Sequence, residues 1–129
     1  MKTYWDSSAL LEALGDDAVR RRLTATGGVT RTHALAEVFS TITGGGVGLR
    51  VTADVGAQLI QQLAEKLEFC DLTAPEILAA LAHARAKGVR GGRVHDYLHA
   101  VAAKKAKAGL LLTSDKFDFS GLFEKVEVL

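Results

Sequence analysis

Two aspartates directly follow predicted strands, and their carboxylates could form one shared anionic site. Asp6 comes after the short aromatic stretch 2–5, and Asp115 comes after the leucine run 110–112 and two hydroxyl residues. In an open α/β sheet, chemistry gathers at the carboxyl ends of the strands, so both side chains are expected at one edge. Carboxylates grouped without histidine or cysteine ligands suit a hard cation such as Mg²⁺ or Mn²⁺.

Two further acids lie on predicted helices and have ordinary explanations when each is taken alone. Glu37 lies on the flank of a helix that ends near residue 43, where a solvated carboxylate is common. Asp96 falls in the first turn of the predicted helix 94–108, where backbone N–H groups and the helix dipole favour a charged carboxylate. Both acids gain a functional interpretation only beside the two strand-end aspartates.

The elements that must position these acids alternate along the chain in the order β-α-α-β-α-α-β-α-α-β-β. Three consecutive leucines at 110–112 are typical of a strand covered on both faces. The third strand is predicted at 69–72, and the last, at 125–129, is predicted at a sheet edge. Strands separated by helices favour a parallel sheet with right-handed crossovers, and therefore an α/β fold.

Capping signals predict where several helices begin. Ser7 is predicted to cap a first helix that Gly15 ends. Thr73 and Glu76 form a capping-box pattern, with a proline in the first turn, for a helix predicted to reach Lys87. Helical spacing also predicts the core-facing side of the helix after the second strand, made by Leu35, Val38, Phe39 and Ile42.

Composition limits the class of protein. The 129 residues fit one domain, and the net charge of +1 provides no global field for nucleic acid, so such binding would depend on local patches. The single cysteine, Cys70, excludes an intrachain disulfide and is expected to be a buried, inert thiol, which fits a cytoplasmic protein. The first residues lack a signal-peptide pattern, and no apolar run approaches the roughly 20 residues of a membrane span, so no membrane partner is expected.

Four segments carry the acids in a recognisable order: Trp5-Asp6-Ser7-Ser8-Ala9-Leu10, Ala36-Glu37-Val38, His95-Asp96-Tyr97-Leu98-His99, and Leu112-Thr113-Ser114-Asp115. Together they resemble a PIN domain, and the small single-domain form is similar to the VapC toxins of toxin–antitoxin pairs. The resemblance covers essentially the whole chain, and the Thr-Ser-Asp that ends the leucine strand is its strongest part. It implies one PIN-like domain over 1–129, a three-layer α/β/α sandwich with a mainly parallel sheet of about five strands.

The resemblance carries an acidic quartet over to four residues of this chain: Asp6, Glu37, Asp96 and Asp115. Ser8 and Thr113 match hydroxyls that orient the site, and Asp118 matches a fifth acid present in many members. The family implies a metal-dependent endoribonuclease, in which one or two Mg²⁺ or Mn²⁺ ions activate a water and neutralise charge on the scissile phosphate. Asp6 and Asp115 are expected to bind the metal directly, whereas Glu37 and Asp96 complete the site directly or through water.

The resemblance also implies partners, namely an RNA substrate, a cognate antitoxin protein that blocks the site, and a second copy of the chain in a homodimer. Arg90 and Arg93 lie just before Asp96 and could hold RNA phosphates, although a solvated loop explains them equally well. The predicted helix 52–67 carries more apolar surface than one face needs, which suits a dimer interface. One departure is His99, because the family usually has a plain aliphatic residue there.

Two functions of other classes stay open. Asp6 could be the nucleophile of a phosphotransferase, although haloacid-dehalogenase-like enzymes carry a second acid where this chain has Ser8. The chain could also be an inert PIN-like module that binds RNA or a protein partner. A zinc site is disfavoured, because His95 and His99 have the right spacing on one helix but nothing else of a zinc pattern accompanies them.

Overall fold

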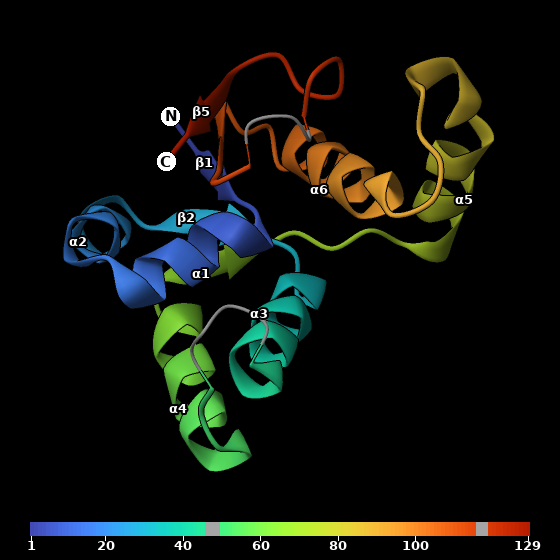
Figure 1. Cartoon of the computed structure of the whole chain (residues 1–129). Coiled ribbons are helices and arrows are strands. Elements are labelled where there is room, and N and C mark those ends of the chain that lie inside the picture. Colours follow the sequence, from blue (N-terminus) through green and yellow to red (C-terminus); the bar gives the residue numbers. More distant parts are fainter. Residues whose placement is uncertain (46–49, 116–118) are drawn as a thin grey trace.

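The parallel α/β sheet predicted from the sequence is confirmed in a computed structural model of the chain, which describes residues 1–45, 50–115 and 119–129 (Figure 1). The strands of these described residues are β1 (Thr3–Trp5), β2 (Gly28–Thr30), β3 (Leu67–Phe69), β4 (Leu110–Thr113) and β5 (Val126–Val128). All of their pairings are parallel, and their spatial order is β3-β2-β1-β4-β5.

Helices cover both faces of this sheet, which gives three layers. One face carries α1 (Ser7–Gly15), α2 (Asp17–Thr26), α3 (His33–Gly44) and α4 (Ala53–Ala64). The other carries α5 (Ala74–Ala82), the 3₁₀ turn η1 (Arg85–Lys87) and α6 (Arg93–Lys105). Figure 1 shows the two groups of helices on opposite sides of the strands. Within the described residues no helix is long and apolar enough to cross a membrane.

The central strands send alternate side chains into two separate cores. Tyr4 and Leu111 are fully buried in a core with α5 and α6, whereas Trp5 and Leu112 are fully buried in a core with α1 to α4. This alternation is the ordinary geometry of a β-strand, in which successive side chains point to opposite faces. β1 and β4 are therefore covered on both faces, as the leucine run predicts.

The chain reverses its direction of travel across the sheet beside β1. It proceeds from β1 outward through β2 to β3 and then returns to the other side of β1 to form β4 and β5. The carboxyl ends of β1 and β4 flank this topological switch point, where open α/β sheets bind their ligands. The Asp6 N–H extends the β1–β4 pairing by donating to the carbonyl of Leu112 at 3.1 Å, so both strands deliver their next residues to one place.

The prediction for β3 is wrong by two residues, because the strand lies at Leu67–Phe69 and not at 69–72. Its register is set by β2, since Thr30 lies opposite Phe69 and the Thr30 carbonyl accepts from the N–H of Cys70 at 2.8 Å. β3 is an edge strand, and Glu68 and Phe69 are both exposed. An edge strand needs little apolar sequence, which is why the apolar run after it was misleading.

Two of the predicted helix ends also differ. Asp6, and not Ser7, caps α1, because β1 ends at Trp5 and the next residue already has the extended backbone of a cap. α5 ends at Ala82, and the chain reaches Lys87 through the 3₁₀ turn. Local sequence signals fix a helix end only to within one or two residues, so the difference at α1 is of the ordinary kind, while the predicted end of α5 coincides with the end of the 3₁₀ turn.

α3 presents a slightly different side to the core than its apolar stripe predicts. Ala34, Val38 and Ile42 are buried, whereas Leu35 and Phe39 are only partly buried. This rotation matters for the candidate site, because it leaves Glu37 half-buried at the boundary between the core and solvent. α3 therefore presents the Glu37 carboxylate toward its neighbours and not simply toward water.

Candidate active site

Asp6 is a buried carboxylate at the carboxyl end of β1, with 3% of its surface exposed. Its Oδ1 accepts the N–H of Ala9 at 2.8 Å, as the cap of α1, and the hydroxyl of Ser8 at 2.7 Å. Burial raises the pKa of the Asp6 carboxyl, although the hydrogen bonds from Thr113, Ala9 and Ser8 favour its charged form. None of the ion pairs within the described residues joins Asp6 to a lysine or arginine.

Ser8 and Thr113 tie the ends of β1 and β4 together. Their hydroxyl oxygens lie 3.0 Å apart, and the Ser8 oxygen also accepts the N–H of Ser114 at 2.9 Å. The Thr113 oxygen in turn accepts the N–H of Asp115 at 3.1 Å. A chain of hydrogen bonds therefore connects the Asp6 carboxylate to the backbone of Asp115.

Glu37 reaches the same region from α3 and is held by a histidine of α6. The Glu37 Oε1 lies 2.9 Å from Nε2 of His99, and Nδ1 of His99 lies 2.7 Å from the hydroxyl of Tyr4. Burial alone would raise the pKa of the Glu37 carboxyl, but the His99 hydrogen bond, with the nearby His33 and His95, brings that pKa below its ordinary value. Glu37 is therefore ionised at neutral pH.

Asp96 lies in the first turn of α6, as predicted, and is partly buried. Residues three apart on a helix share one face, so Asp96 and His99 lie on the same side of α6. Because His99 contacts Glu37 and lies near enough to Asp6 to influence its carboxyl, three acids of the quartet lie around this histidine. The His99 imidazole is thus a shared neighbour of side chains from β1, α3 and α6.

Asp115 follows β4 with an exposed side chain. It lies at a cavity of about 360 Å³ lined also by Phe119, Gly121, Glu124 and Val126, toward the β5 side of the sheet. Asp118, the fifth acid expected from the resemblance, lies outside the described residues. The Asp115 carboxylate is therefore the most accessible of the quartet to a ligand that arrives from solvent.

The described residues do not form a closed metal cage, because no three His, Cys, Asp or Glu side chains among them lie close enough together to hold an ion. The donors at this edge are nevertheless carboxylate oxygens, and Mg²⁺ is commonly bound by one or two carboxylates and several waters. The buried charge of Asp6, which lacks a lysine or arginine partner in the described chain, is a position that a cation would stabilise. The residues present therefore fit a hydrated hard cation.

The histidines of α6 do not form the zinc pair that their spacing allows. Both ring nitrogens of His99 already have partners, in Tyr4 and Glu37. The exposed ring of His95 stacks on that of His33, with centroids 6.4 Å apart and an angle of 18° between the planes. The sequence pattern did not predict Tyr4 or His33 at this site. The sign of Tyr4 was a polar hydroxyl in a strand that is covered on both faces.

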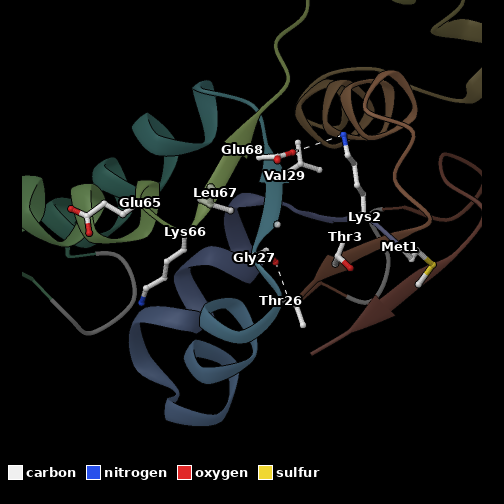
Figure 2. Close-up of a pocket in the computed structure, with 11 residues that line it drawn as sticks. Met1, Lys2, Thr3, Thr26, Gly27, Val29, Glu65, Lys66, Leu67 and Glu68 are labelled. Atoms are coloured by element: carbon white, nitrogen blue, oxygen red, sulfur yellow. Dashed lines mark hydrogen bonds and ion pairs between the residues drawn. The ribbon is translucent and has the colours of Figure 1, made fainter.

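A second cavity, of about 460 Å³, lies at the opposite end of the sheet. Residues that precede or begin β1, β2 and β3 line it, and Figure 2 shows Lys2 reaching toward Glu68, with which it forms an ion pair at 3.9 Å. Open α/β sheets bind ligands at the carboxyl ends of their strands, and this cavity is at the amino ends. Its side chains carry charges of both signs without a shared target, so it does not compete with the Asp6 edge as a candidate active site.

Comparison of the chain with protein-family models gave no match, and comparison with curated proteins gave no similar sequence. Function is therefore inferred from the fold and from the side chains at the switch point.

Proposed function

We propose that the chain is a metal-dependent endoribonuclease of the PIN-like kind, acting in the cytoplasm as the toxin of a toxin–antitoxin pair. The observation that carries the proposal is the buried Asp6 carboxylate at the switch point, linked through Ser8 and Thr113 to the segment that begins at Asp115. The parallel sheet and the order of the acids along the chain agree with the resemblance described above.

Within this proposal, each carboxylate has a separate task. Asp6 and Asp115 would hold a Mg²⁺ or Mn²⁺ ion, while Glu37 and Asp96 would complete the site directly or through water. The bound ion would activate a water and neutralise charge on the scissile phosphate. Ser8 and Thr113 orient Asp6 and the backbone after β4 through their hydrogen bonds.

The alternative in which Asp6 is a phosphotransferase nucleophile is disfavoured by its surroundings. A nucleophile must reach the phosphorus atom of its substrate, whereas Asp6 is 3% exposed and its Oδ1 caps α1. An inert RNA-binding or partner-binding module differs from a nuclease only in the reaction, so cleavage decides between them.

The deciding experiment is incubation of the purified chain with a mixed RNA substrate in Mn²⁺, in Mg²⁺ and in EDTA. We expect metal-dependent cleavage that leaves defined product ends, because carboxylates without a cation cannot neutralise the developing charge. Intact RNA in both metals, with the protein folded by circular dichroism, would instead favour the inert module.

Arg90 and Arg93 have different surroundings, so we propose different roles for them at RNA. Arg93 is partly buried and its Nη2 donates to the Ser120 carbonyl at 2.7 Å, which ties α6 to the segment after β4. Arg90 is exposed on the loop before α6 and is the better candidate for a phosphate contact.

Arg90→Ala should weaken RNA binding in EDTA and lower the slope of log affinity against log salt by about 0.7, the value for one single-strand phosphate contact. Arg21→Ala is the matched control, because Arg21 is an exposed arginine of α2, far from the loop before α6 in Figure 1. Titrations at four salt concentrations measure both slopes. Equal slopes for the two variants would assign Arg90 to a solvated loop.

The proposed protein partners are an antitoxin that covers the carboxylate edge and a second copy of the chain. Apolar side chains exposed on α4 and α5 support a protein interface, among them Val55 at 43% and Leu78 at 67% exposed. A stable homodimer would bury at least roughly 1,200 Å² in total. α4 matches the predicted dimer helix 52–67, and α5 adds an exposed apolar surface that was not predicted from the sequence.

A further inference from the structure

His99 is a polar side chain buried in a helix face made largely of small apolar residues. It is 1% exposed, and Ala100, Ala102 and Ala103 beside it on α6 are buried as well. An imidazole removed from water lowers stability unless both of its nitrogens are hydrogen-bonded. Here both nitrogens have partners, and the partners come from two other elements, Tyr4 of β1 and Glu37 of α3.

The proton positions along these contacts follow from the chemistry of the two ends. The Glu37 carboxylate only accepts when it is ionised, so Nε2 of His99 carries the proton and donates it. When the ring is neutral, Nδ1 is then an acceptor, and the Tyr4 hydroxyl donates to it at 2.7 Å. Burial raises the pKa of the Tyr4 phenol, which keeps that donor protonated. The hydrogen bonds therefore run in one direction, from Tyr4 through His99 to Glu37.

We propose that His99 is a positioning residue for the Glu37 carboxylate, fixed in place by the Tyr4 hydroxyl. The inference rests on the proposed function, because it assigns His99 to the same metal-dependent site. A hydrogen bond from His99 to Oε1 restricts the rotation of the Glu37 carboxylate. Among the described residues its other oxygen accepts from the Ser7 hydroxyl over a long 3.5 Å. Residues that hydrogen-bond a metal-binding carboxylate typically change metal affinity or activity by about 10–100-fold when replaced.

A purely structural His99 would be served by an apolar side chain, since it lies beside alanines of α6 and against the Tyr4 ring of β1. The hydrogen bonds from Tyr4 through His99 instead end on the half-buried Glu37 carboxylate, at the sheet edge that also holds Asp6. The test must therefore separate the hydrogen bond between His99 Nε2 and Glu37 from the packing of the His99 ring.

Two substitutions separate these contributions. His99→Asn places an amide near the position of Nδ1 but is too short to reach Glu37, whereas His99→Gln extends a donor to about the position of Nε2. His83→Asn is the matched control, because His83 is an exposed histidine at the end of α5 and is not among the groups that act on Glu37. For each variant, RNA cleavage rates are measured against Mn²⁺ concentration, and melting is measured in EDTA and with added Mn²⁺.

We expect His99→Asn to raise the Mn²⁺ concentration for half-maximal cleavage by about 10-fold or more, and to reduce the Mn²⁺-induced rise in melting temperature. His99→Gln should recover most of this loss, and His83→Asn should match the parent. If the parent cleaves RNA and the His99→Asn variant shows the same Mn²⁺ dependence, the inference about His99 is overturned while the proposed function stands. Equal losses in His99→Gln and His99→Asn, with equally low melting in EDTA, also overturn it. A parent that neither cleaves RNA nor responds to Mn²⁺ overturns the proposed function as well.

Discussion

Asp115→Asn is expected to abolish metal-dependent RNA cleavage while leaving the melting temperature in EDTA equal to that of the parent or higher. The Asp115 side chain is exposed, and the backbone N–H of this residue holds its place by donating to Thr113, a bond that asparagine keeps. The substitution also removes one negative charge from an edge that holds Asp6. Two unit charges about 5 Å apart at an effective dielectric of 20 repel by about 3 kcal/mol.

The measurement is a pair of melting curves, in EDTA and in Mn²⁺, beside a cleavage assay in Mn²⁺. Because a ligand that binds only the native state raises its stability, the variant should show a smaller Mn²⁺-induced shift than the parent. Loss of a group that stabilises the transition-state charge typically lowers the rate by at least about 100-fold. Glu124→Gln is the matched control, since Glu124 is an exposed carboxylate at the same cavity but outside the quartet.

Two results would remove Asp115 from the proposed site. The first is normal cleavage by the asparagine variant. The second is a melting temperature well below that of the parent in EDTA, because Asp115 would then stabilise the fold irrespective of metal. A Glu124→Gln variant that loses cleavage equally would point to the whole cavity and not to the strand-end position.

The features that the sequence predicted correctly depend on neighbours along the chain. The capping box is one example, because Thr73 and Glu76 satisfy each other's backbone N–H groups at 3.3 and 2.8 Å. A lysine from α6 completes it, since Lys105 donates to Glu76 at 2.6 Å and is the main reason why the Glu76 pKa is lowered to about 2. The element order was predicted correctly for the same local reason.

The position of β4 beside β1 could not be read from local pattern, and it is what assembles the site. Thr3 pairs with Leu110 and Trp5 with Leu112, across more than half of the chain. This pairing brings Ser8 within 3.0 Å of Thr113. The general rule that chemistry gathers at strand ends placed Asp6 and Asp115 at one edge, but their connection through two hydroxyls depends on the strand order.

The role of His99 was equally hidden in the sequence. The histidine was noticed because it departs from the aliphatic residue usual in the family it resembles, yet neither partner is near it along the chain. Tyr4 is 95 positions away and Glu37 is 62. A buried polar side chain finds its partners through tertiary packing, so periodicity shows where it is buried but not what it contacts.

Asp6 is expected to behave differently from Asp115, because its carboxylate has a structural task as well as the proposed catalytic one. Asp6→Ala removes the cap of α1 and leaves the buried N–H of Ala9 and the hydroxyl of Ser8 without their shared acceptor. Loss of an N-cap alone costs about 1 kcal/mol, and each unsatisfied buried donor costs about 1–3 kcal/mol. Removal of a buried charge offsets part of this, so we expect a net loss of about 2 kcal/mol in the free energy of unfolding.

Asp6→Asn is the matched variant, since its amide oxygen can still accept from Ala9 and Ser8 while the negative charge is removed. Burial raises the pKa of the Asp6 carboxyl, which means that the charged form is disfavoured in the folded state without metal. The asparagine variant should therefore unfold in urea and EDTA at the parent's midpoint or higher, whereas the alanine variant unfolds earlier. Both should lose RNA cleavage, because neither provides a carboxylate for the cation. An alanine variant as stable as the parent would show that the cap contributes little, and cleavage by the asparagine variant would show that the charge of Asp6 is not needed at the site.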